Sequence, residues 1–202
     1  MKDAIFKGIS FVFHPLIMPL LGVLFYYSKT PRFIPMPVVK AKIFSIVILT
    51  ILIPILLFFL LKTIRKVETI YLKSTQERII PLFINSIITL LIILRVMRPT
   101  EAMLLYYFFY GILISNILCL ILAIFKLKAS IHMIAASGFF MFALTVGIYF
   151  KININGTISL MLIILGGIAS ARLYLKAHTA KELILGVAVG LLPQLFFLVF
   201  FL

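Results

Sequence analysis

The chain contains seven apolar runs of about 20 residues, and this pattern constrains its fold more than any other feature. Such a run is long enough to cross the hydrocarbon core of a bilayer as an α-helix. Helices are expected because lipid offers the backbone no hydrogen-bond partner, and the alternating pattern of barrel strands is missing from the sequence. The sequence therefore predicts an all-α polytopic membrane bundle, with spans at residues 8–27, 42–61, 79–97, 102–125, 131–150, 157–175 and 183–202.

The composition agrees with a protein that lies mostly in lipid. Hydrophobic residues make up 64% of the 202 residues and charged residues 12%, about half of the roughly 25% that is usual in soluble proteins. Too few polar residues remain to cover a soluble core, which argues against a soluble enzyme or nucleic-acid-binding domain despite the formal net charge of +14. We expect a single transmembrane domain over residues 1–202, with membrane lipids and no nucleic acid as partners.

The first span is the least regular, because His14, Pro15 and Pro19 lie within it. Proline lacks a backbone N–H and disfavours helix at the residue before it. We therefore predict a broken or interfacial helix here, which leaves six or seven full crossings. The segment shows no small-residue cleavage site and is interpreted as a retained part of the protein. For His14 we favour a packing or interfacial role over catalysis.

Small residues cluster in the last three predicted spans, where they favour close contacts between helices. Gly166 and Gly167 belong to the sixth span. In the seventh, Gly186 and Gly190 are four residues apart and share one helix face. Two interpretations of this face stay open: a homodimer contact, or packing within the chain, which we favour.

Ionisable residues in a membrane protein are usually functional, paired or anchored at the interface, so their positions carry most of the functional information. Three short polar segments stand out, at residues 73–78, 129–132 and 172–182. Two predicted spans separate each segment from the next, so the chain crosses the membrane and returns between them. All three segments are therefore expected at the same membrane face.

The third segment has the clearest chemical pattern. His178 and Glu182 are four residues apart, so on a helix the carboxylate can fix the tautomer of the imidazole. Thr179 and Glu182 match a capping box, which places His178 just before a helix N-terminus, where phosphate and a neutral imidazole are favoured. In the second segment, Ser130 can cap a helix that holds His132 in its first turn.

Taken together, the three segments resemble the type-2 phosphatidic acid phosphatase superfamily, which includes integral-membrane lipid phosphatases. Its signatures are Lys, six residues, Arg-Pro; then Pro-Ser-Gly-His; then Ser-Arg, five residues, His, three residues, Asp. The resemblance covers about residues 73–182, slightly over half of the chain, and the third signature is the closest match. The matching residues are Lys73, Arg78, Ser130, His132, Arg172, His178 and Glu182.

The resemblance implies hydrolysis of a lipid phosphate or diphosphate without a metal or other cofactor. His178 would attack phosphorus and form a phosphohistidine, Glu182 would orient it, and His132 would protonate the leaving oxygen. The phosphoryl oxygens would be held by Lys73, Arg78, Arg172 and Ser130. The resemblance also points to the cytoplasmic (inner) membrane of a bacterium.

The sequence departs from the family pattern at several positions. Ile131 replaces Gly, Ala171 replaces Ser, Glu182 replaces Asp, and four residues rather than six separate Lys73 from Arg78. These departures leave open a catalytically silent relative that binds or moves an anionic lipid. An unrelated transporter is a third possibility, with a polar site at mid-membrane formed by Asn85, Ser86, Ser115 and Asn116. Basic residues occur at both faces, so the side of the membrane that holds the polar segments also stays open.

Overall fold

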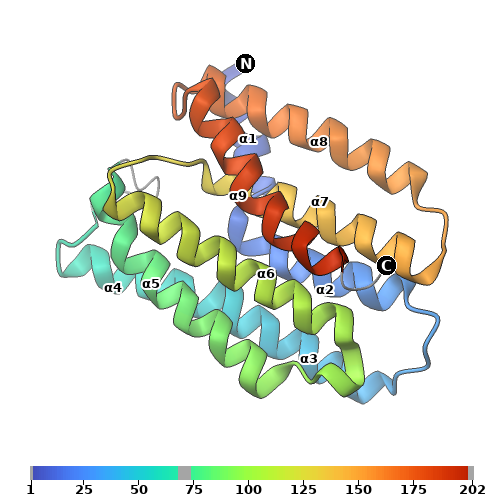
Figure 1. Cartoon of the computed structure of the whole chain (residues 1–202). Coiled ribbons are helices and arrows are strands. Elements are labelled where there is room, and N and C mark those ends of the chain that lie inside the picture. The colour runs from blue at the N-terminus through green and yellow to red at the C-terminus, as the bar shows by residue number, and fades with distance from the viewer. Residues whose placement is uncertain (1, 68–73, 200–202) are drawn as a thin grey trace.

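The computed structural model describes residues 2–67 and 74–199 as a bundle of helices, with no strand among these residues (Figure 1). Within these described ranges, seven helical stretches are long and apolar enough to span a membrane, as the sequence predicts. Their helices are α1 (Lys2–Val12) with α2 (Met18–Lys29), α3 (Met36–Val47) with α4 (Ile53–Thr63), α5 (Thr75–Leu91), α6 (Pro99–Ile124), α7 (Ile131–Phe150), α8 (Asn155–Tyr174) and α9 (Ala180–Val199).

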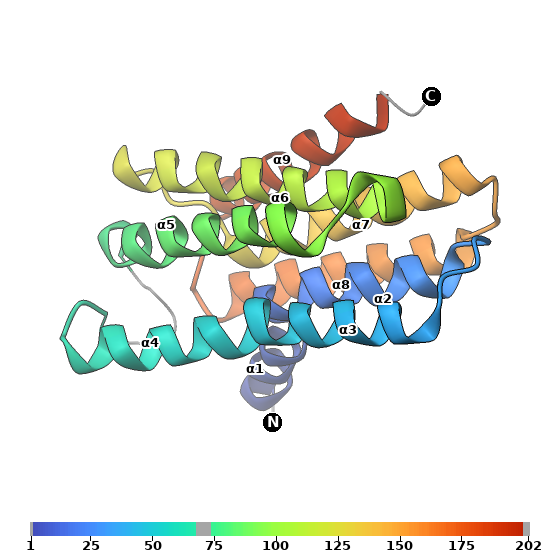
Figure 2. The same cartoon turned by 90° about the horizontal axis from the view of Figure 1, so that it is seen from below.

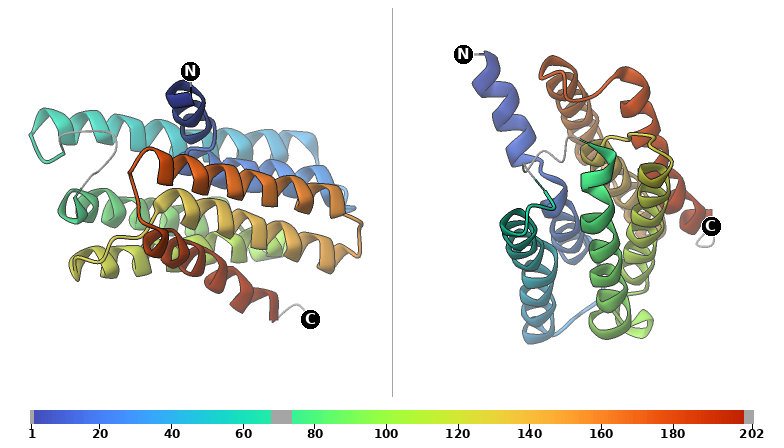
Figure 3. Two further views of the ribbon diagram at one scale, coloured as in Figure 1. Left: turned by 90° about the horizontal axis from the view of Figure 1, so that it is seen from above. Right: turned by 90° about the vertical axis from the view of Figure 1, so that its left-hand side faces the viewer.

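The first span is broken, as its prolines predict. The helix α1 ends at Val12, His14 is extended, and a 3-10 turn over Pro15–Ile17 leads into α2. The break turns α1 away from the long axis of the bundle, so that it runs across the direction of the other helices (Figures 2 and 3). It packs against the end of α8, where the rings of Phe6 and Tyr174 lie 4.4 Å apart.

The helix α7 is the centre of the bundle. In the most apolar part of α7, 61% of the residues are buried within the bundle, whereas the same share is 11% for the stretch from α3 to α4. The helices α3 and α4 therefore lie at the lipid-facing periphery. The largest buried cluster joins α2, α6 and α7 and includes Ile46 of α3 and Ile88 of α5. Within it Phe108 stacks on Phe142, with ring centroids 4.1 Å apart. Gly22 permits this arrangement, because a Cβ atom there would lie 2.4 Å from the Phe108 ring.

The glycines of α9 pack within the chain, the alternative that we favoured. A Cβ atom at Gly190 would lie 2.1 Å from the carbonyl oxygen of Ile134, and one at Gly186 would lie 2.7 Å from that of Ser130. Both glycines are buried against α7, so a homodimer through this pair would first have to open the α7–α9 contact. Gly166 and Gly167 of α8 differ, because a Cβ atom at either would meet nothing within 4 Å.

Four helices end on a basic residue with positive φ. These residues follow α4, α6, α7 and α8, at positions where glycine is the usual residue because it has no Cβ atom to clash. Their φ values lie between 50° and 60°. The four are Arg65, Lys126, Lys151 and Lys176.

Candidate functional site

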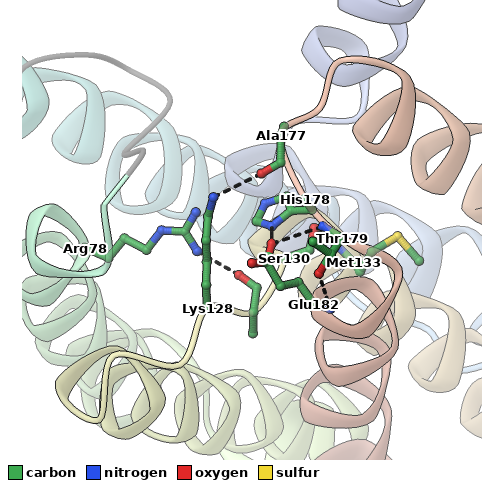
Figure 4. Close-up of polar contacts among 9 residues, drawn as sticks. Arg78, Lys128, Ser130, Met133, Ala177, His178, Thr179 and Glu182 are labelled. Carbon is green, nitrogen blue, oxygen red and sulfur yellow. Dashed lines mark hydrogen bonds and ion pairs between the residues drawn. The ribbon is translucent and has the colours of Figure 1, made fainter.

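The second and third polar segments and the described part of the first meet at one end of the bundle. Here α5, α7 and α9 begin, while α6 and α8 end, as the count of membrane crossings predicts (Figure 1). The loops before α7 and before α9 lie side by side, with the start of α5 beside them (Figure 4). Lys73, a predicted phosphate ligand, lies outside the described residues.

The centre of the site is the pair His178 and Glu182 at the start of α9. The Nδ1 atom of His178 lies 2.7 Å from Oε2 of Glu182. The backbone N–H of Thr179 donates to the same carboxylate at 3.3 Å, and the N–H of Glu182 donates to the Thr179 hydroxyl at 3.4 Å. This is the predicted capping box. A carboxylate only accepts hydrogen bonds, so Nδ1 carries the proton and the Nε2 lone pair of His178 is available to react.

Burial and charge keep His178 neutral. Its side chain is 2% exposed. Burial lowers the pKa of His178 to about 4, and the cations Arg78, Lys128 and Arg172 act in the same direction, although the hydrogen bond to Glu182 opposes them. At neutral pH the imidazole is therefore uncharged, which is the form that a nucleophile requires.

Arg78 and Lys128 bring positive charge to this pair from two other elements. Arg78 is buried in the first turn of α5, which Ser74 caps, and its Nη1 donates to the carbonyl of Ala129 at 2.7 Å. Lys128 lies in the loop before α7, and its Nζ donates to the carbonyl of Ala177 at 3.1 Å. Burial lowers the pKa of Lys128, Glu182 opposes this effect, and Arg78 and Arg172 add to it.

Sequence reasoning did not select Lys128 as a site residue. The signal available was its position two residues before Ser130, in the same loop. Its bond to Ala177 ties the two loops together next to His178, a contact between segments 49 residues apart. Sequence spacing alone does not indicate a contact of that kind.

Ser130 caps α7, as predicted, and joins it to α9. Its hydroxyl accepts from the N–H of Met133 at 3.5 Å, and its own N–H donates to the carbonyl of Glu182 at 3.1 Å. Ser130 is fully buried, and Gly186 permits the close approach of its backbone. These contacts hold the first turn of α7, and therefore His132, against the first turn of α9.

His132 and His14 lie together, which we did not predict. The two rings are edge to face, with centroids 5.6 Å apart. The Nε2 atom of His132 lies 3.1 Å from the carbonyl oxygen of Ser10, and Nδ1 of His14 accepts from the N–H of Leu16 at 3.3 Å. His14 therefore belongs to the same polar cluster as His132. The His-Pro break was the available signal, but it does not indicate where the broken helix turns.

Arg172 connects the two halves of the cluster. It is buried in the last turn of α8, and it is within electrostatic range of His178 and also of His14 and His132. The structure thus brings together six of the seven predicted site residues, the exception being Lys73. Among the described residues, no group of three or more His, Cys, Asp and Glu side chains could hold a metal ion.

The polar residues at mid-membrane are engaged with neighbouring helices. The Ser115 hydroxyl donates to the carbonyl of Val189 at 2.9 Å, and Nδ2 of Asn116 donates to the Thr89 hydroxyl at 3.3 Å. Ser86 donates to the carbonyl of Leu82 in its own helix at 2.9 Å. These contacts are helix packing contacts, and they give the transporter interpretation no added support.

No family model matches the chain, and neither a curated protein nor a solved structure matches it significantly. The chemistry of the site is therefore the basis for assigning a function.

Proposed function

We propose that the protein is a metal-independent lipid phosphatase or diphosphatase, a divergent member of the type-2 phosphatidic acid phosphatase superfamily, that works through a phosphohistidine at His178. The observation that carries the proposal is the buried His178, whose Nδ1–H is donated to Glu182 and whose Nε2 is thereby left with a lone pair. This is the arrangement of a histidine nucleophile with an orienting carboxylate.

In the first step, Nε2 of His178 attacks phosphorus, and the bond from phosphorus to the leaving oxygen breaks. His132 takes a proton from the bound phosphate group and gives it to that oxygen. In the second step, His132 takes a proton from water, the water oxygen attacks phosphorus, and the N–P bond breaks. Phosphate leaves with the proton that His132 took from water, and both histidines return to their neutral starting states.

Cations around His178 support this chemistry. Arg78 comes from the start of α5, Lys128 from the loop before α7 and Arg172 from the end of α8, and all three are within electrostatic range of the imidazole. Negative charge on the phosphoryl oxygens would be stabilised by such groups, more strongly in a buried site than in water. Lys73 and Ser130 stay predicted ligands of the same phosphate.

The position of the site supports a lipid as substrate. The polar cluster lies where apolar helices end, so a phosphate headgroup would reach it while its hydrocarbon tail stays among membrane lipids. A phosphatidic acid-like lipid and a polyprenyl diphosphate both have this shape. The proposal therefore covers monoester and diphosphate substrates.

Phosphate release from both lipids tests the proposal directly. Protein purified in detergent with EDTA is expected to release phosphate, and His178→Gln is expected to lower the rate at least about 1,000-fold. Lys181→Gln is the matched control, because Lys181 is exposed in the same turn of α9, and it should stay within about twofold of the wild type. Full activity of His178→Gln would disprove the mechanism.

A second candidate function is binding of an anionic lipid without turnover. It is favoured by the contacts that the site groups already make, because Arg78 and Lys128 donate to main-chain carbonyls and His132 is anchored to Ser10. Vesicles that contain phosphatidic acid distinguish the two functions. Binding that depends on Arg78 and Lys128, with no phosphate released from either lipid, would support this candidate.

A further inference from the structure

The N-terminal segment lies outside the residues that resemble the superfamily, yet it contacts the site. The helix α1 ends at Val12, so the carbonyl groups of its last turn have no partner within the helix. One of them, on Ile9, accepts from the N–H of Phe13 at 3.0 Å. The next, on Ser10, is the group that lies 3.1 Å from Nε2 of His132.

This contact determines the tautomer of His132. A carbonyl oxygen only accepts, so the hydrogen bond requires a proton on Nε2. In the neutral ring the lone pair is then on Nδ1. His178 is the opposite case, because its bond to Glu182 places the proton on Nδ1 and the lone pair on Nε2. The two histidines of the proposed reaction are thus held in complementary tautomers.

His14 supports the same arrangement from the break after α1. It caps the turn Pro15–Ile17 by accepting the N–H of Leu16 on Nδ1, so its own proton lies on Nε2. Its ring stands edge to face against His132. Pro15 maintains the break, because proline disfavours helix at the residue before it. The ring of His132 is therefore held on two sides by one short stretch of chain.

We propose that segment 10–14 is a positioning element, which holds His132 as the Nε2–H tautomer and makes Nδ1 the nitrogen that exchanges protons with the substrate. The role of Nδ1 in catalysis rests on the proposed function, whereas the tautomer of His132 does not depend on that function. The N-terminal helix is then a working part of the site, and not only a membrane anchor.

Nitrogen NMR tests the tautomers without any substrate. The protein has three histidines, so a sample with 15N-labelled histidine gives a spectrum that single substitutions can assign. Near pH 8, where the rings are neutral, we expect His178 as the Nδ1–H form and both His14 and His132 as the Nε2–H form. An Nδ1–H form of His132, or an even mixture of its two forms, would overturn the inference.

Two substitutions of His14 separate ring contact from helix capping. His14→Asn can still accept the Leu16 N–H but loses the ring, whereas His14→Phe keeps a ring and loses the cap. We expect His14→Asn to give a mixture of His132 tautomers and His14→Phe to preserve the Nε2–H form. If His14→Asn instead preserves the Nε2–H form and His14→Phe gives the mixture, His14 acts only as a helix cap and its positioning role is overturned. Phe11→Ala is the control, because Phe11 is 78% exposed on α1.

Kinetics gives an independent readout. His14→Asn is expected to lower kcat by between several-fold and about 100-fold with KM unchanged, because misplacement of a proton donor affects the chemical step. His132→Gln keeps a donor for the Ser10 carbonyl but cannot exchange a proton, so it should lower kcat further. A change confined to KM in both variants would contradict the inference. Absence of turnover in the wild type, with tautomers as expected, would contradict the proposed function alone.

Discussion

Each end of the bundle holds a glutamate paired with a base, but the two pairs differ in burial and in charge. At one end, Glu101 lies 2.5 Å from Lys42 and 3.8 Å from Arg98, and its side chain is 40% exposed. At the other end, Glu182 lies 2.7 Å from a His178 side chain that is 2% exposed. The first pair joins α3 to α6, whereas the second joins two residues of the same helix start.

This difference separates a structural carboxylate from a candidate catalytic one. Glu101 neutralises a lysine and so closes an ion pair between two helices. Glu182 orients an imidazole that stays neutral, in a region where Arg78, Lys128 and Arg172 supply positive charge. Buried positive charge favours a nearby anion, so the cations around His178 suit an anionic ligand at the second end.

Matched substitutions of the two glutamates give the largest expected contrast. Glu182→Gln removes the carboxylate charge and offers His178 an NH2 donor as well as an acceptor, so the tautomer is no longer fixed, and phosphate release should fall by roughly 100-fold to 10,000-fold. Glu101→Gln leaves the site end unchanged, and its rate should stay within about twofold of the wild type. Equal losses in the two variants, measured with the same lipid, would show that the two ends do not differ as proposed.

The pH dependence of activity tests whether the buried His178 is neutral. Because its pKa is lowered to about 4, the imidazole stays neutral down to that pH, and the acid limb of kcat/KM is expected near pH 4 and not near its ordinary value of 6.5. An acid limb at pH 6 or above would contradict a buried neutral His178.

Stability should follow the sign of this shift. His178 has a lower pKa in the folded state than its unfolded value of 6.5, so the unfolded chain binds the proton first as pH falls. The free energy of unfolding should therefore decrease as pH falls from 6.5 to about 4, and then level off. Thermal unfolding of the wild type and of His178→Gln across this range measures the contribution, which should be missing from the variant.

The contact between α7 and α9 runs from the site end to the middle of both helices, and glycine substitutions test it. Gly190→Ala places a Cβ atom 2.1 Å from a backbone oxygen, so it should destabilise the protein by about 1–3 kcal/mol. In Gly166→Ala the new Cβ atom meets nothing within 4 Å, so the substitution should stabilise α8 by up to about 1 kcal/mol. A thiol-reactive dye can follow thermal unfolding, because Cys119 is buried. Equal shifts in Tm would contradict the packing described.

The smallest effect is expected from the ion pair at the other end. A double-mutant cycle with Lys42→Met and Glu101→Gln should give a coupling of about 1 kcal/mol, because the partly exposed glutamate is screened by solvent. Activity should be unchanged in all three variants. A loss of phosphate release here would assign Lys42 and Glu101 to function and remove the distinction between the two ends.

Spacing along the sequence predicted the helices and their common face, but not the directions of their side chains. The span predicted at residues 131–150 is α7, and the break near His14 is present. Boundaries at polar ends were less accurate: α5 begins at Thr75 and not at residue 79, because Ser74 caps a charged first turn. Apolar runs mark the hydrocarbon core, whereas caps extend helices beyond it.

The parts of the site that sequence reasoning missed depend on tertiary packing. His14 meets His132 because the turn Pro15–Ile17 packs against α7, and a break in a helix does not determine which neighbour the broken end contacts. Lys128 reaches Ala177 because the loops before α7 and α9 lie side by side. Likewise, small residues in α9 mark a helix contact, whereas the glycines of α8 do not, and composition alone cannot separate the two cases.

The basic residues with positive φ at four helix ends relate the fold to the lipids around it. Glycine would avoid a backbone cost of roughly 1–2 kcal/mol at each of these positions, yet the chain has Arg65, Lys126, Lys151 and Lys176 there. A cation at a helix C-terminus is favourable for the helix dipole, and it can also attract the headgroups of anionic phospholipids. In nonionic micelles the cost of the positive φ angles is unchanged, but the basic residues have no anionic headgroups to attract. The protein is therefore expected to withstand heat better in bilayers rich in phosphatidylglycerol than in such micelles.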